Sequence, residues 1–151
     1  MPRFSASVDI NRPIAEVSAF VAEPKNWLKW ESGLVVSEQT SDGPVGVGTT
    51  GHRVNQFMGR RIETTWEVTE YAPDVRAAFK STSGDMSYTG SMQFDAVDGG
   101  TRFTYSIDGQ LSGFFWRLLE PLVGMMGQRQ FRSDLNRLKE LLEAEASGSE
   151  A

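Results

Sequence analysis

The chain has 151 residues, enough for one domain with a sizeable core and too few for two ordinary ones. Its net charge of −5 argues against nucleic acid as a partner, because phosphate binding requires a basic surface, and it disfavours electrostatic docking onto anionic lipid. The absence of cysteine excludes disulfide and thiolate chemistry. The first residues lack the apolar run of a signal peptide, and no segment is long and apolar enough to be transmembrane. We therefore expect a cytoplasmic protein of one domain.

The start of the chain predicts one strand followed by two short helices. Apolar and polar residues alternate over Arg3–Ile10, which indicates a strand with one buried face. Asn11 offers a side-chain cap and Pro13 suits a first helical turn, so we expect a helix from there through Val21. A second short helix should carry two aromatic residues, Trp27 and Trp30, which are interpreted as a structural plug under the sheet.

Residues 34–109 have the pattern of an antiparallel meander. We expect strands at 34–40, 49–58, 60–71, 75–81, 86–94 and 101–107. The turn Asp98-Gly99-Gly100 is typical of a hairpin between the last two strands. Gly90 lies in the middle of a predicted strand, which indicates a bulge or sharp bend that curls the sheet.

Residues 111–146 predict one long C-terminal helix whose apolar face changes side halfway along. The second half has an apolar stripe at helical spacing, made of Phe131, Leu135, Leu138 and Leu142. Continued backwards, the same stripe meets small or polar residues, namely Gln128, Gly127, Gly124 and Glu120. Such a helix closes a core at its end and faces open space, or a second partner, at its start. Residues 147–151 are expected to be a disordered tail.

These elements predict an α+β domain over residues 1–146, with a curved antiparallel sheet of about seven strands wrapped around the long helix. The predicted inward face combines aromatic residues, methionines and small residues, whereas a solid core would favour branched aliphatic residues. We therefore predict a ligand cavity between sheet and helix. Its expected lining is Trp66, Phe79, Tyr88, Met92, Phe103 and Tyr105 from the sheet, with Gly124, Gln128 and Phe131 from the helix.

The order of elements resembles the helix-grip fold of the START-like (SRPBCC) superfamily. Within that superfamily, the sequence most resembles the polyketide cyclase/dehydrase-like proteins. The likeness covers residues 3–143 and depends on three groups of segments. These are Ile10-Asn11-Arg12-Pro13-Ile14-Ala15-Glu16-Val17 with Phe20, Pro24, Trp27 and Trp30; Gly46-Val47-Gly48-Thr49 with Trp66-Glu67-Val68-Thr69-Glu70-Tyr71-Ala72-Pro73; and Gly100-Thr101-Arg102-Phe103-Thr104-Tyr105 with Leu135, Leu138, Lys139, Leu142 and Glu143. The resemblance implies an apolar cavity that holds a hydrophobic small molecule. It carries over no catalytic residue, since no single catalytic motif defines the group.

Three residues are weak candidates for catalysis. His52, the only histidine, would be a general base if it lay at the mouth of the cavity, but it fits a solvent-facing position equally well. Tyr88 and Tyr105 fall on the inward face and would donate hydrogen bonds to a carbonyl or enolate oxygen in a cyclase. The alternative for each tyrosine is an amphipathic core residue. The sequence shows no metal-binding pattern and predicts no cofactor.

The start of the last helix leaves two questions open. If the helix is straight, Arg117 and Glu120 point towards the cavity; if Pro121 restarts it at a new angle, they face solvent. Its apolar residues Phe114, Phe115, Trp116, Leu118 and Leu119 suit a lid, an interfacial anchor or a homodimer contact.

The sequence thus predicts a protein that binds a lipid, polyketide or aromatic metabolite. One alternative is a cofactor-independent polyketide cyclase or dehydratase that uses Tyr or His groups of the cavity. The other is a protein-interaction module or homodimer that uses the patch at residues 114–119. Convergence of ionisable side chains in the cavity would distinguish the enzyme from the binding protein, and we expect few to converge.

Overall fold

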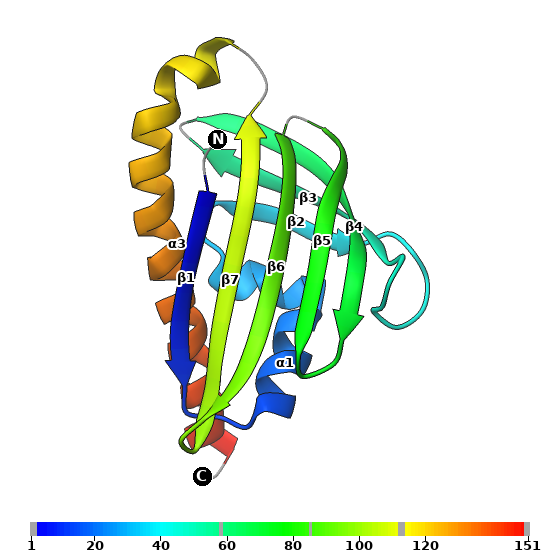
Figure 1. Ribbon diagram of the computed structural model, residues 1–151, viewed down its shortest axis with the longest axis vertical. Coiled ribbons are helices and arrows are strands. Elements are labelled where there is room, and N and C mark those ends of the chain that lie inside the picture. The colour runs from blue at the N-terminus through cyan, green and yellow to red at the C-terminus, as the bar shows by residue number, and fades with distance from the viewer. Residues whose placement is uncertain (1–2, 58, 85, 112–113, 150–151) are drawn as a thin grey trace.

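The computed structural model describes residues 3–57, 59–84, 86–111 and 114–149, and in them seven antiparallel strands form one curled sheet (Figure 1). The strands lie in the order β1-β7-β6-β5-β4-β3-β2. They are β1 (Arg3–Ile10), β2 (Leu34–Gln39), β3 (Thr50–Phe57), β4 (Arg60–Ala72), β5 (Arg76–Gly84), β6 (Met86–Val97) and β7 (Gly100–Leu111). The helical elements are α1 (Ile14–Ala22), the 3-10 turn η1 (Pro24–Asn26), α2 (Trp27–Trp30) and α3 (Phe114–Ser149). The predicted helix-grip α+β fold is confirmed.

The helices cover the concave face of the sheet. The long helix α3 packs along β1 at one edge, and α1 lies under the lower part of β6 and β7 (Figure 1). Helix α1 begins as expected after Pro13, but Asn11 does not cap it: no side-chain cap is formed. The backbone N–H of Asn11 instead donates to Glu143 Oε2 of α3, at 3.0 Å. This bond fastens the β1–α1 connection to the end of the long helix.

The register shifts of the sheet lie in β4 and, between Leu34 and Val36, in β2, but not at Gly90. In β4 they are two, since its register with β5 shifts between Thr65 and Trp66 and again between Val68 and Glu70. Gly90 pairs in regular register with Phe79 on β5, and a Cβ at this position would clash with the Phe79 ring. The glycine therefore makes room for an aromatic ring across the strand, and the prediction of a bulge at Gly90 was wrong. A single mid-strand glycine does not distinguish these two roles.

The lower part of the concave face is solidly packed. Trp30 meets Phe103 and Tyr105 edge to face, with ring centroids 6.3 and 5.9 Å apart, so it plugs the sheet from below. The predicted apolar stripe of α3 seals this core through Leu135, Leu138 and Leu142, all buried. The inward strand residues were predicted correctly: Val8, Trp66, Phe79, Tyr88, Met92, Phe94, Phe103 and Tyr105 are buried.

The end of α3 lies further along the chain than expected. The helix includes Ser149, so the expected tail at 147–151 overlaps its last residues, and residues 150–151 lie outside the described part. Pro121 lies inside the helix rather than at a break between two helices. The side chains of Arg117 and Glu120 lie outside the described residues, so the question of their direction stays open.

Candidate functional site

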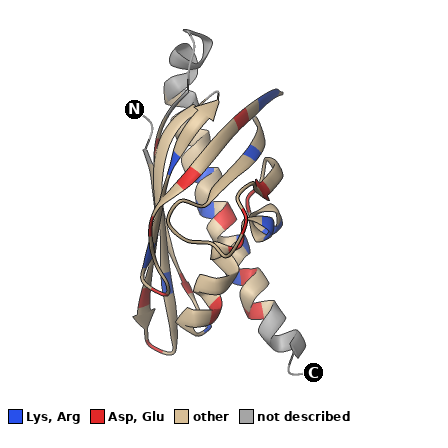
Figure 2. Cartoon of the chain, turned by 90° about the vertical axis from the view of Figure 1, so that its right-hand side faces the viewer, with Lys and Arg blue, Asp and Glu red and all other residues tan. Residues whose placement is uncertain are grey.

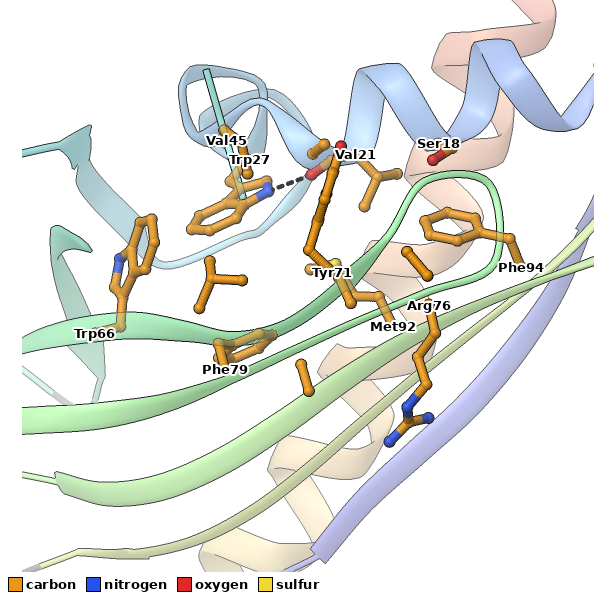
Figure 3. Close-up of a pocket in the computed structure, with 15 residues that line it drawn as sticks. Ser18, Val21, Trp27, Val45, Trp66, Tyr71, Arg76, Phe79, Met92 and Phe94 are labelled. Carbon is orange, nitrogen blue, oxygen red and sulfur yellow. Dashed lines mark hydrogen bonds between the residues drawn. The ribbon is translucent and has the colours of Figure 1, made fainter. Parts of the chain in front are cut away.

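A small apolar pocket lies between α1 and the strands β4–β6 (Figure 3). Its volume of about 30 Å³ is room for about one water molecule. Trp27 forms part of its wall, held by a hydrogen bond of 2.7 Å from its indole N–H to the carbonyl oxygen of Val21 (Figure 3). The predicted lining residues Trp66, Phe79 and Met92 surround this pocket. It is too small for a lipid or an aromatic metabolite.

A larger cavity of about 200 Å³ lies where the middle of α3 crosses the sheet. Its apolar wall comes from β1, β6, β7 and α3, through Phe4, Met86, Ile107, Gly127 and Phe131. Its polar wall comes from β3, β4, the segment after α2 and α3. The residues there are Glu31, Ser32, Arg53, Asn55, Gln56, Thr64, Gln130 and Asp134. The cavity therefore has one apolar side and one polar side.

Small and aromatic residues of α3 shape the apolar wall. Gly127 lies against Phe4 of β1, and a Cβ there would come within 2.6 Å of the Phe4 ring. One turn later Phe131 stacks on Phe4, with centroids 6.1 Å apart, and meets Tyr105 edge to face at 4.9 Å. The helix thus approaches β1 closely and leaves the space beside β3 unfilled. Gly127 was predicted to face open space; it lines the cavity but also packs tightly against β1.

A buried ion pair dominates the polar wall. Arg53 on β3 donates from Nη2 to Glu31 Oε1 at 2.9 Å, and the two side chains are only 10% and 12% exposed. The Nε of Arg53 also donates to Asn55 Oδ1 at 3.2 Å. Burial lowers the pKa of Arg53, but the charge and hydrogen bond of Glu31, together with the two nearby tyrosines, raise the pKa above its ordinary value. The guanidinium therefore stays charged, and its charge is compensated.

Two tyrosines lie next to this ion pair. Tyr88 lines the cavity, and its hydroxyl lies 3.4 Å from Thr64 Oγ1. Tyr105 lies deeper, and its hydroxyl oxygen is buried without a hydrogen-bond partner among the described residues, as is Glu31 Oε2. Burial raises the pKa of both tyrosines, so both stay protonated at neutral pH.

A third ionisable group comes from α3. Asp134 Oδ1 accepts two hydrogen bonds from Ser32, at 3.2 Å from the backbone N–H and 2.6 Å from the hydroxyl. Gln130 donates to the same serine, to its carbonyl oxygen at 3.0 Å and to its hydroxyl oxygen at 2.7 Å. Burial raises the pKa of Asp134 to about 6, although the bonds from Ser32 oppose this shift. These bonds fasten α3 to the segment after α2 at the edge of the cavity.

Apart from Trp66, Phe79 and Met92 in the small pocket, the predicted ligand-binding residues are distributed over three places. Tyr88 and Phe131 line the larger cavity. Phe103 and Tyr105 are fully buried in the aromatic core. Two others lie on α3: Gly124 is half-buried, and the side-chain amide of Gln128 donates to the carbonyl oxygen of Ser5 at 3.0 Å.

His52 lies outside the lining of the larger cavity. It neighbours Arg53 on β3, so the two side chains point to opposite faces of the sheet. Its Nδ1 lies 3.4 Å from Glu38 Oε1 on the paired strand β2. Cross-strand pairing, rather than spacing along the chain, brings Glu38 close to His52.

Sequence reasoning missed the charged residues of the cavity. We expected few ionisable side chains to converge there, yet Glu31, Arg53 and Asp134 all line it together with Tyr88. Arg53 and Gly51 are two residues apart on β3, so both face the same side of the sheet. Gly51 lies against the inward-pointing Trp66, so alternation along β3 could have placed Arg53 on the inward face. Glu31 and Asp134 lie on separate elements, and no local pattern relates them.

Other features fall outside the cavity or outside the described residues. The side chains of the apolar patch at residues 114–119 are not among those described, so the homodimer alternative stays a prediction. Within the described part of the chain, no helix is long and apolar enough to cross a membrane. No group of three or more His, Asp or Glu side chains among the described residues is arranged to hold a metal ion. Basic and acidic residues are interspersed along α3 (Figure 2).

Comparison with known proteins gives a family match over nearly the whole chain. The model of the family described as "Polyketide cyclase / dehydrase and lipid transport" matches residues 1–143. No curated protein matches the sequence.

Several solved structures are similar to this one over almost the whole of this chain. The protein TTHA0849 from Thermus thermophilus is 25% identical, with a TM-score of 0.82 over 95% of this chain and 98% of that one. DR_A0006 from Deinococcus radiodurans is 17% identical, with a TM-score of 0.74 over 95% and 98% of the two chains. DynU16, described as a putative protein in the dynemicin biosynthetic locus, is 15% identical, with a TM-score of 0.64 over 95% of this chain and 48% of that one. The last two likenesses concern the fold alone.

Proposed function

Because the chain belongs to the polyketide cyclase/dehydrase and lipid transport family, we propose that it binds a hydrophobic small molecule in the larger cavity. The observation that carries this proposal is the unfilled space between the middle of α3 and the sheet, about 200 Å³ beside Phe4, Ile107 and Phe131. Apolar burial contributes about 25 cal/mol per Å² removed from water, offset by the cost of association. The polar wall would orient the ligand.

The cavity volume limits the rigid part of the ligand. An engineered apolar cavity of about 150 Å³ holds benzene, so about 200 Å³ suits a skeleton of one or two rings or a short folded chain. A lipid, a polyketide fragment and an aromatic metabolite all include such groups.

Native mass spectrometry of the purified protein tests the proposal. We expect a mass above that of the 16.7 kDa chain, and organic extraction should release an apolar compound reproducibly. Protein stripped of this compound should bind it again at one equivalent per chain. A stripped protein that binds none of its extracted compounds would overturn the proposal.

A second candidate is a cyclase or dehydratase, favoured by the ionisable groups that line the cavity. Arg53 and the Tyr88 hydroxyl are donors suited to a developing enolate oxygen, and Asp134, with a pKa of about 6, is suited to take up a proton near neutral pH. In that reaction the cavity would hold a polyketide chain folded against its apolar wall. The balance of proton donors and acceptors is the specific support for this candidate.

Replacement of Tyr88 by Phe tests the enzyme hypothesis once a substrate has been found by activity screening. The change removes one hydroxyl and retains the ring, so we expect a loss of kcat of about 10²-fold or more with little change in binding. Tyr71→Phe is the matched control, because Tyr71 lines the small pocket instead. Unchanged turnover in Tyr88→Phe would remove this residue from the mechanism.

A further inference from the structure

The polar wall of the larger cavity has no net positive charge, because its single guanidinium faces two carboxyl groups. The Arg53 guanidinium is paired with Glu31 at 2.9 Å inside the protein. Asp134 is the other charged residue among the described lining, and its side chain is bonded to Ser32. The lining therefore has no excess positive charge to offer a ligand.

From this lack of excess positive charge we infer that the cavity selects ligands whose polar group is uncharged, such as a ketone, amide or hydroxyl, and that it rejects carboxylates. This inference rests on the proposed binding function and names the class of ligand that the site would take. It separates neutral polyketides and phenols from free fatty acids and aromatic acids of the same size.

The physical reason is the cost of removing an anion from water. A carboxylate that enters the cavity loses hydration, which costs several kcal/mol unless a positive charge compensates it. Arg53 cannot compensate it without giving up Glu31, and Glu31 and Asp134 would repel it. A neutral group avoids this cost and still finds donors and acceptors, because the bonds to Glu31 and Asn55 occupy two of the five N–H groups of Arg53.

Two probes of nearly the same shape isolate the effect of charge. At pH 7, 2-naphthamide is neutral and 2-naphthoate is a carboxylate, and both have the two-ring size that the cavity suits. Isothermal titration calorimetry on the stripped wild-type protein should give at least about tenfold tighter binding for the amide. This comparison needs no variant, so it does not depend on how any substitution affects folding.

Glu31→Gln should strengthen the binding of carboxylates to the cavity. The substitution leaves the Arg53 charge unpaired in the cavity wall, where a ligand carboxylate can replace the lost one. We expect 2-naphthoate to bind Glu31→Gln at least about tenfold more tightly than it binds the wild type, and to raise the melting temperature of the variant. Glu140→Gln is the matched control, because it removes the same charge from an exposed position of α3 outside the described lining.

The outcomes separate this inference from the proposed function. Equal or tighter binding of 2-naphthoate to the wild type would overturn the inference and leave a hydrophobic binding site in place. Failure of the stripped protein to bind its own extracted compound and both probes would overturn the proposed function and the inference with it. An equal gain of naphthoate affinity in Glu31→Gln and Glu140→Gln would also contradict the inference, since it would indicate a general charge effect.

Discussion

At the scale of single residues, the Glu31–Arg53 pair decides what the cavity can accept and also affects stability. Both side chains are nearly buried, and Glu31 Oε2 lacks a hydrogen-bond partner among the described residues. A buried pair gives little net stability by itself, but removal of one member leaves an uncompensated charge. Replacement of one member of the pair should therefore lower the free energy of unfolding much more than replacement of both members.

We expect Arg53→Met to lower the free energy of unfolding by about 3–5 kcal/mol, because Glu31 would then be buried without its partner. The double variant Glu31→Leu/Arg53→Met should recover most of this loss. Urea unfolding measures both. Arg61→Met is the control, since its partner Glu63 and Arg61 itself are half exposed and such pairs contribute about 1 kcal/mol or less. Equal losses in Arg53→Met and the double variant would contradict this prediction.

Asp134 should make stability depend on pH with a defined sign. Its pKa is raised from 3.8 to about 6 by burial, so the folded protein binds this proton more tightly than the unfolded chain does. The contribution of Asp134 to the free energy of unfolding is therefore greatest below the unfolded pKa and decreases as pH rises towards the folded pKa. The variant Asp134→Asn cannot ionise at this position, so its free energy of unfolding lacks this decrease. Its amide oxygen can still accept the hydrogen bond from the Ser32 hydroxyl.

Urea unfolding at about pH 4 and about pH 7 tests this pH dependence. The free energy of unfolding of Asp134→Asn, minus that of the wild type, should be more positive at the higher pH. The same difference at both values would show that the Asp134 carboxyl has an ordinary pKa in the folded protein.

At the scale of elements, residue pattern predicted the strands and their inward faces, since alternation and turn residues are local signals. The hairpin at Asp98-Gly99-Gly100 formed as expected, with Gly99 at a φ of 73°, where glycine is favoured. The location of the β4 bulges was not predicted, because a bulge depends on the partner strand. The charged wall was missed for a related reason: Glu31, Arg53 and Asp134 come from three elements that meet only in the folded chain.

Gly90 provides a test at this scale. Gly90→Val should displace the Phe79 ring that lies across it and lower the free energy of unfolding by about 1–3 kcal/mol. Thr89→Val introduces the same side chain at the exposed neighbouring position of β6 and should change stability much less. Urea unfolding of the two variants checks the difference. If Gly90→Val were as stable as Thr89→Val, the glycine would have another role.

At the scale of the whole molecule, one helix has two roles. The second half of α3 seals a solid aromatic and aliphatic core through Leu135, Leu138 and Leu142. The first half brings Gly127 and Phe131 to a cavity of about 200 Å³. The sequence predicted the sealing stripe of the second half, whereas Gln128, predicted to face open space, bonds to β1 instead. The extent of the cavity was not predictable, because Phe103 and Tyr105 become part of the core when Trp30 packs on them.

If the larger cavity is the binding site, a substitution that fills it should weaken or abolish binding. Ile107→Trp places an indole in the cavity from β7, and Val47→Trp places one at an exposed loop position. Circular dichroism would confirm that both variants fold, and calorimetry would measure their binding of the compound extracted from the wild type. We predict that Ile107→Trp binds this compound about tenfold or more weakly than the wild type, whereas Val47→Trp binds it with unchanged affinity. Undiminished binding by folded Ile107→Trp would contradict the account.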